Sequence, residues 1–221
     1  MLYKKAYLIS FFLFIFCYVA SAQIPVDKER HHQVVLENKY IRLLEGKIPF
    51  KDTTVAHLHA ANSEIIFLSH SIFGIEIAGE KPVVSEVNPG DLKYAAYRDK
   101  PVIHKVWNQR KDVLHFMVVE IIDQHIDSND CTILSQPGIK FQSHQKFLNT
   151  YSLDITKGRQ LHLQKSNCNR LLIRILGAIN IISSDNKTAV STGSFAFFPS
   201  QKEIWISSNS KNARYILLEL K

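Results

Sequence analysis

Three histidines and one glutamate form the pattern in this chain with the clearest chemical meaning. His57 and His59 are separated by one residue, Glu64 follows five residues later, and His104 lies in a second apolar segment. Alternate residues of a β-strand point to the same side, so a strand places His57 and His59 side by side. Imidazole and carboxylate groups are ligands of Fe, Mn, Ni, Cu and Zn. The pattern predicts a divalent transition-metal site at His57, His59, Glu64 and His104, of unspecified metal.

Glu64 depends on the turn that precedes it. Its spacing from His59 is odd, so one continuous strand would direct it to the opposite side. A turn at residues 61–63 resets the phase in this interpretation and brings Glu64 inward as a ligand. The alternatives are that Glu64 is a surface residue or a general base. Asn108, four residues after His104, is interpreted as structural.

Short β-branched and aromatic segments separated by turn residues run through the whole chain, with almost no helical periodicity. This pattern predicts an all-β protein, a sandwich or a barrel. The expected strands of the first half are 33–36, 41–48, 55–59, 64–69, 74–77, 83–87, 92–96, 102–108 and 114–121. Those of the second half are 147–155, 160–163, 171–176, 178–182, 196–199, 204–207 and 215–220.

The two halves follow a similar layout, which predicts two copies of one barrel rather than one large sandwich. The expected domains are a first barrel over residues 23–125, a linker over 126–140 and a second barrel over 141–221. Aligning the halves puts Gln164 and Ser166 where His57 and His59 stand, and Trp205 in place of His104. The second barrel is therefore expected to bind no metal and to pack against the first barrel or close its cavity.

The spacing of these residues resembles the motifs of the cupin superfamily. The first cupin motif is matched by His-Leu-His at 57–59 with Glu64, and the second by His104 with Asn108. The resemblance covers roughly residues 33–121 and the second half only in outline. It implies two tandem jelly-roll barrels, with the metal ligands in the first.

Composition and the first residues narrow the class of protein further. Met1–Ala22 has two lysines, an apolar run and a terminal Ala-Ser-Ala, which predicts a signal peptide cleaved before Gln23 and a secreted or periplasmic protein without a membrane span. The formal net charge of +7 is spread along the chain, so nucleic acid is not an expected partner. Cys131 and Cys168 form a disulfide if they lie close together, and are free buried thiols otherwise.

The leading functional hypothesis is a metal-dependent oxygenase or isomerase that acts on a small molecule. The alternatives are a non-catalytic barrel that binds a sugar or another small ligand, and a structural envelope protein. In either, the histidines line a metal-free polar cavity or hold a structural metal. A homodimer is compatible with this class of barrel. His31 and His32, ahead of the first strand, are interpreted as a solvated terminus, and the remaining histidines as surface or packing residues.

Overall fold

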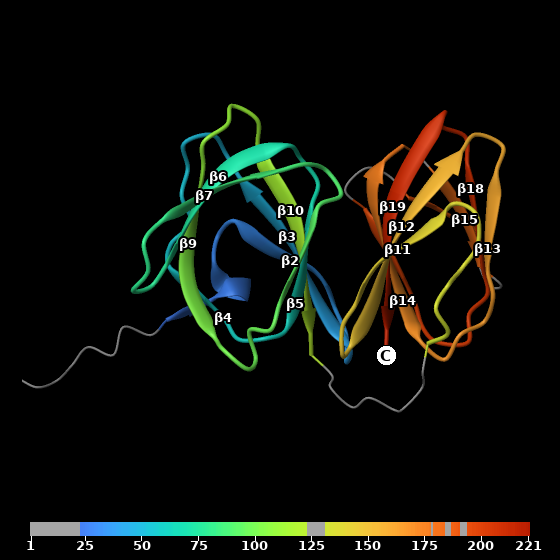
Figure 1. The fold of residues 1–221 in the computed structure, drawn as a ribbon, viewed down its shortest axis with the longest axis horizontal. Helices are drawn as coiled ribbons and strands as arrows, with labels where there is room; N and C mark the ends of the chain where they lie inside the picture. Colours follow the sequence, from blue (N-terminus) through green and yellow to red (C-terminus); the bar gives the residue numbers. More distant parts are fainter. Residues whose placement is uncertain (1–22, 123–130, 178, 184–186, 191–193) are drawn as a thin grey trace, which may run out of the picture.

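The computed structural model describes residues 23–122, 131–177, 179–183, 187–190 and 194–221. The expected signal peptide and residues 126–130 of the expected linker lie outside these residues. Figure 1 shows two β-lobes side by side, the first in blue and green and the second in yellow and red. The all-β prediction is confirmed, and the one helical element among the described residues is a single 3-10 turn, η1 at Val26–Lys28.

The first lobe contains two five-stranded sheets, with strand orders β1-β4-β9-β6-β7 and β2-β3-β10-β5-β8. The short strand β1 runs parallel to β4, and the other pairs of named strands are antiparallel. The strands are β1 (Ile24–Pro25), β2 (His32–Glu37), β3 (Ile41–Ile48), β4 (His57–His59), β5 (Ser63–Phe67), β6 (Ser71–Ile77), β7 (Val83–Val87), β8 (Leu92–Ala95), β9 (Val102–Asn108) and β10 (Leu114–Ile121).

The second lobe repeats this plan with a sheet ordered β11-β12-β19-β14-β17 and a sheet ordered β13-β18-β15-β16. Its strands are β11 (Ile139–His144), β12 (Leu148–Thr156), β13 (Gln160–Leu163), β14 (Asn169–Leu176), β15 (Ile179–Ser183), β16 (Lys187–Val190), β17 (Phe195–Phe198), β18 (Ile204–Ser208) and β19 (Asn212–Leu220).

A hydrophobic core between the two lobes joins them, in addition to the core inside each lobe. The outward side chains of β3, β5 and β10, among them Ile66 and Met117, pack against those of β12, β14 and β19, among them Leu171 and Leu218. Central strands of both inner sheets are therefore buried on both faces. This is why β10, with the sequence LHFMVVEI, is apolar at most of its positions instead of alternating.

Each lobe also has an interior core. In the first lobe Leu44, Ile48, Leu114 and Phe116 lie inside, one residue out of phase with the interlobe set. In the second lobe the interior is filled by side chains such as Leu153, Leu161 and Tyr215. Arg170 and Glu219, on the same strand faces as Leu172 and Leu217, add a buried ion pair to this second interior, whereas the first interior holds histidines.

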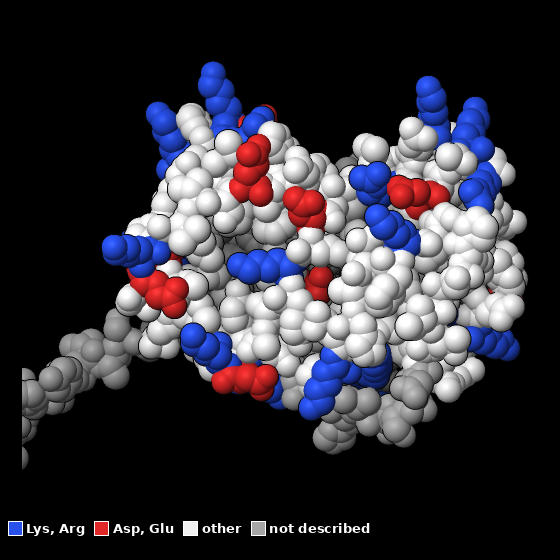
Figure 2. Space-filling model, in the orientation of Figure 1, with Lys and Arg blue, Asp and Glu red and all other residues white. Residues whose placement is uncertain are grey.

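Charged side chains are scattered over the surface. Figure 2 shows lysine and arginine interspersed with aspartate and glutamate over one face. The excess of positive charge is not gathered into one patch there. Within the described residues, no helix is long and apolar enough to cross a membrane.

Candidate metal centre

Strands β4 and β9 bring the three predicted histidines together. His57 and His59 lie on the same side of β4, and both are buried. His104 lies directly opposite His57 on the neighbouring strand β9. Because paired residues of adjacent strands share one face of the sheet, all three rings enter the interior of the first lobe.

The ring nitrogens of these histidines converge. The Nε2 atom of His57 lies 3.1 Å from Nε2 of His59 and 3.1 Å from Nε2 of His104. Two nitrogens bound to one ion at about 2.0–2.1 Å, with an angle between about 90° and 109°, lie about 2.9–3.4 Å apart. The observed separations therefore match those of imidazoles that share one metal ion.

The hydrogen-bonding pattern of the cluster is incomplete without a cation. Nδ1 of His57 donates to the carbonyl oxygen of Val55 at 2.8 Å, which leaves a lone pair on its Nε2. That single lone pair faces two other Nε2 atoms, and the buried Nδ1 atoms of His59 and His104 have no partner. A neutral imidazole cannot satisfy two such neighbours, whereas a metal ion accepts all three lone pairs.

All three imidazoles are held in the neutral form that binds metals. Burial lowers the pKa of His57 to about 4, that of His59 to about 2 and that of His104 to about 3, and neighbouring histidines add to the shift for each. At neutral pH these rings carry no charge. No proton has to be displaced before they bind a cation.

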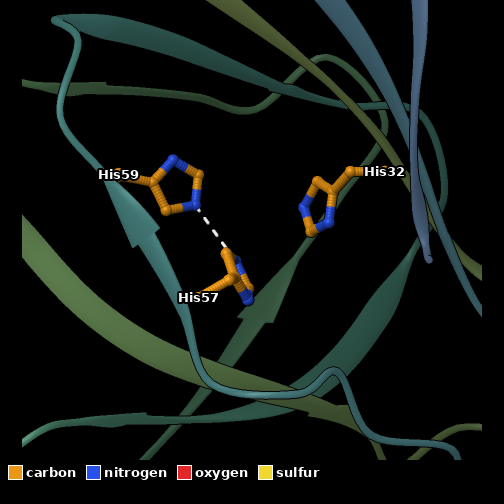
Figure 3. Close-up of side chains that lie close together, drawn as sticks. All are labelled: His32, His57 and His59. Atoms are coloured by element: carbon orange, nitrogen blue, oxygen red, sulfur yellow. Dashed lines mark hydrogen bonds between the residues drawn. The ribbon is translucent and has the colours of Figure 1, made fainter. Parts of the chain in front are cut away.

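A fourth imidazole, His32 of β2, faces the same space, although the sequence predicted a solvated terminus there. His32 is buried, and one of its nitrogens lies within 4.8 Å of nitrogens of His57 and His59. Figure 3 shows the rings of His32, His57 and His59 around a common centre. The fold corrects the prediction because β2 pairs with β3 and so carries His32 into the barrel.

A buried carboxylate orients His32. Glu29 accepts hydrogen bonds from Nδ1 of His32 at 2.8 Å and from Nδ1 of His31 at 2.9 Å, and His31 also contacts Asp52 at 3.0 Å. Burial alone would raise the pKa of Glu29, but the hydrogen bonds from His32 and His31 outweigh it and lower that pKa to about 2. Glu29 therefore fixes the tautomer that leaves Nε2 of His32 free to bind a metal.

Replacing Glu29 with glutamine is expected to weaken metal binding about 10- to 100-fold, the usual effect of losing a carboxylate behind a ligating histidine. The amide cannot accept from both His31 and His32 as the carboxylate does. Competition with a chelator of known affinity measures the change. A Glu37→Gln variant, which alters an exposed carboxylate bonded to Arg42, is the matched control. Equal affinities for the two variants would contradict a role for Glu29.

The structure does not bring Glu64 to the histidines. Ile65 and Phe67 line the cavity beside His59 and His104, whereas Ile66 belongs to the interlobe core. Glu64 shares the face of Ile66, so it points out of the barrel toward the second lobe. The turn before β5 therefore does not reset the strand phase as expected, and the assignment of Glu64 as a ligand is corrected.

Asn108 serves the backbone at the end of β9. Its side-chain amide donates to the carbonyl oxygens of Ile48 and Asp112, and its Oδ1 accepts from the backbone N–H of Arg110. These bonds tie the β9–β10 turn to the end of β3. Asn108 is thus a structural residue of the site.

A cavity of about 60 Å³ adjoins the histidines. Small-molecule sites commonly have about 300–1,000 Å³, so this space is small. Its walls are mainly apolar, with Phe67, Phe73 and Phe116 among them, and its polar lining comprises His32, His59, Lys93, Tyr97 and His104. The ring of Tyr97 lies 5.0 Å from that of His59 between centroids. The cavity thus suits a small, largely apolar molecule.

The second lobe has no comparable group among its described residues. Its His162 shares a hydrogen bond of 2.6 Å with Glu203 and stacks on Trp205 with 4.9 Å between ring centroids. Gln164 and Ser166 line a polar surface pocket. The second lobe packs against the first lobe through the apolar interlobe core described above.

The buried carboxyl group of Glu64 is expected to make the stability of the fold depend on pH. Burial raises its pKa to about 7, above its ordinary value of 4.5. Stability contributed by the protonated form is present below pH 4.5 and is lost as the pH rises through 7. Glutamine does not ionise, so Glu64→Gln avoids this loss. The free energy of unfolding of the variant, relative to that of the original chain, should therefore be about 3 kcal/mol higher at alkaline pH than at acidic pH. Urea unfolding at both pH values measures it, and a difference that does not change with pH would contradict it.

Comparisons with known proteins agree with this architecture. No protein-family model matches the chain, and no curated protein is similar to it in sequence. A salicylate 1,2-dioxygenase from Pseudoaminobacter salicylatoxidans, in a structure with gentisate, superposes with a TM-score of 0.64 at 10% identity, over 90% of this chain and 75% of that one. A cupin 2 barrel protein from Leptotrichia buccalis gives 0.56 at 13% identity, over 86% and 88%.

Procruciferin, an 11S globulin from Brassica napus, gives a TM-score of 0.62 at 10% identity, over 81% of this chain and 75% of that one. At such identities the similarity shows the fold alone, and these neighbours differ widely in what they do. Two jelly-roll lobes, histidines converging inside the first, and neighbours of this kind together show that the chain has the fold of the cupin superfamily.

Proposed function

We propose that the protein binds one divalent transition metal in its first lobe through His57, His59 and His104, with His32 as a further ligand in place of Glu64. The observation that carries this proposal is the pair of 3.1 Å separations between the Nε2 atoms. Borderline metals such as Fe, Mn, Co, Ni, Cu and Zn suit a set of imidazoles. The hydrogen bonds of Val55 and Glu29 support it by fixing two of the tautomers.

The residues of the chain prepare this site for chemistry on a small molecule. A bound metal supplies Lewis-acid or redox chemistry at any position that the histidines leave open. Phe67, Phe73 and Phe116 exclude water from the adjoining space. Lys93 and Tyr97 are among the lining residues, and in this proposal they orient a polar end of the substrate.

Of the two enzyme classes, we favour an oxygenase over an isomerase. Isomerisation requires a base beside the metal, and Glu64 faces the second lobe instead. Among the described residues of the cavity lining no carboxylate takes its place. The alternative is a non-catalytic protein that holds the metal, which the small volume of the cavity favours.

Cobalt substitution and azide test for an open coordination position. A catalytic site keeps one position for substrate, and a structural site does not. Azide should shift the visible bands of the cobalt protein. A Val118→Phe variant, which fills the cavity, should bind cobalt but not azide, and Val84→Phe, at an exposed position on β7, should behave as the original chain. Cobalt bands that azide leaves unchanged in the original chain would favour the non-catalytic alternative.

We further propose that the protein is exported. The pattern of residues 1–22 supports this, as does the disulfide between Cys131 and Cys168, because such bonds persist in oxidising compartments. N-terminal sequencing of the protein from the exported fraction should begin at Gln23. Recovery of the chain only inside the cell, with residue 1 intact, would contradict export.

A further inference from the structure

A second pocket lies between the two lobes, outside the barrel that holds the histidines. It has a volume of about 330 Å³, within the usual range for small-ligand sites. The first lobe contributes Glu64 of β5, Tyr94 of β8 and Asp91 of the preceding turn. The second lobe contributes Gln142 of β11 and Gln145 of the β11–β12 turn. Neither lobe forms this pocket alone.

Glu64 is the unusual group in this pocket. It is 1% exposed, and its Oε2 atom has no hydrogen-bond partner. Leaving a buried carboxylate unpaired costs free energy, so native proteins pair such groups with a cation or a donor. Glu64 lies directly opposite Tyr94 in the sheet, so both side chains project toward the second lobe.

The rest of the lining is acidic or neutral. Asp91 adds a second carboxylate, one oxygen of which accepts the backbone N–H of Asn88 at 2.8 Å. Gln142 donates its amide N–H to Ser152 at 2.9 Å, which leaves the amide oxygen of Gln142 as an acceptor. No lysine, arginine or histidine is among the described residues that line the pocket. Its acceptors therefore outnumber its donors, and its charge is negative.

We propose that this interlobe pocket binds a small organic cation through an ammonium group that pairs with the Glu64 carboxylate. The ammonium has three donors, which suits a buried carboxylate in a pocket whose lining residues also carry amide and hydroxyl oxygens. Leu92 provides apolar contact for the carbon chain of the ligand. The second lobe, which lacks the histidines, then has a role in completing a binding site that both lobes share.

Isothermal titration of the purified protein in amine-free buffer tests this proposal, at about pH 8, where Glu64 is ionised. The probes are n-butylammonium and 1,4-diaminobutane, with n-butanol as the neutral analogue. The amines should bind at one site per chain and the alcohol should not. Glu64→Gln should weaken amine binding about 10- to 100-fold, the effect of one charge-assisted hydrogen bond.

Two control variants distinguish this site from the surface carboxylates and from the metal centre. Glu86→Gln, which removes an exposed carboxylate bonded to His70, should leave amine binding unchanged. The double variant His57→Ala/His59→Ala should also bind the amines, because the metal centre is a different site. The proposal is overturned if the amines do not bind, if butanol binds equally well, or if Glu64→Gln binds the amines as the original chain does.

Discussion

Replacing His57 with alanine is expected to weaken transition-metal binding by at least about 1,000-fold, because loss of a residue behind a ligand already costs about 10- to 100-fold. His57 is the central ring of the cluster, since its Nε2 lies 3.1 Å from the Nε2 atoms of both His59 and His104. Its removal leaves the two other nitrogens without their common neighbour. Competition with a chelator, followed by the cobalt absorption bands, measures the affinity.

The matched control for this variant is His162→Ala in the second lobe. His162 is also a strand histidine, but it stacks on Trp205 and bonds to Glu203. This variant should bind metal as the original chain does. If His57→Ala keeps the original affinity, or if His162→Ala loses it, the assignment of the site to the first lobe is wrong.

Replacing Cys131 and Cys168 together with serine is expected to lower the free energy of unfolding by about 4 kcal/mol, the loop-entropy value for a bond that closes a segment of this length. The two cysteines are joined across 37 positions of sequence, with 5.9 Å between their Cα atoms. The bond holds Cys131, ahead of β11, to Cys168, ahead of β14. Urea unfolding measures the change.

Reduction of the original chain with dithiothreitol should reproduce most of this loss, and should leave the double variant unchanged. Metal affinity should be retained, because both cysteines belong to the second lobe. Identical unfolding curves for the oxidised original chain and the double variant would contradict a stabilising bond.

Most of the strands could be predicted from the sequence because their residue types are β-branched and aromatic and their turns are clear. The bounds of β3, β7, β9, β10 and β13 agree with those expected. The strand β11, which begins within the expected linker, was missed. Its side chains are mostly exposed and polar, because it is an edge strand that, among the described strands, pairs only with β12. Backbone pairing, which leaves little trace in composition, determines such a strand.

The candidate site was predictable in part for a similar reason. Strand periodicity places His57 and His59 on one side of a strand, and the residue pattern, which the motif resemblance supports, includes His104. His32 could not be found this way, because its entry into the barrel depends on the pairing of β2 with β3. The only local indication is Glu29, a carboxylate three residues before His32.

Glu64 shows the limit of motif matching. Its position in the sequence fits the first cupin motif, yet the strand phase of β5 sends it to the interlobe face with Ile66. The phase depends on where the turn before β5 ends, which residue types at 61–63 do not determine. The same carboxylate then becomes the central residue of the interlobe pocket.

Elemental analysis of the purified protein tests the proposed metal centre most directly. We expect about one equivalent of a transition metal per chain in the original protein and in His162→Ala. The His57→Ala/His59→Ala double variant should lose that metal while its β-sheet circular dichroism is retained. An original protein that is folded but takes up no metal, even after incubation with Fe, Mn, Co, Ni, Cu or Zn, would contradict the presence of this site.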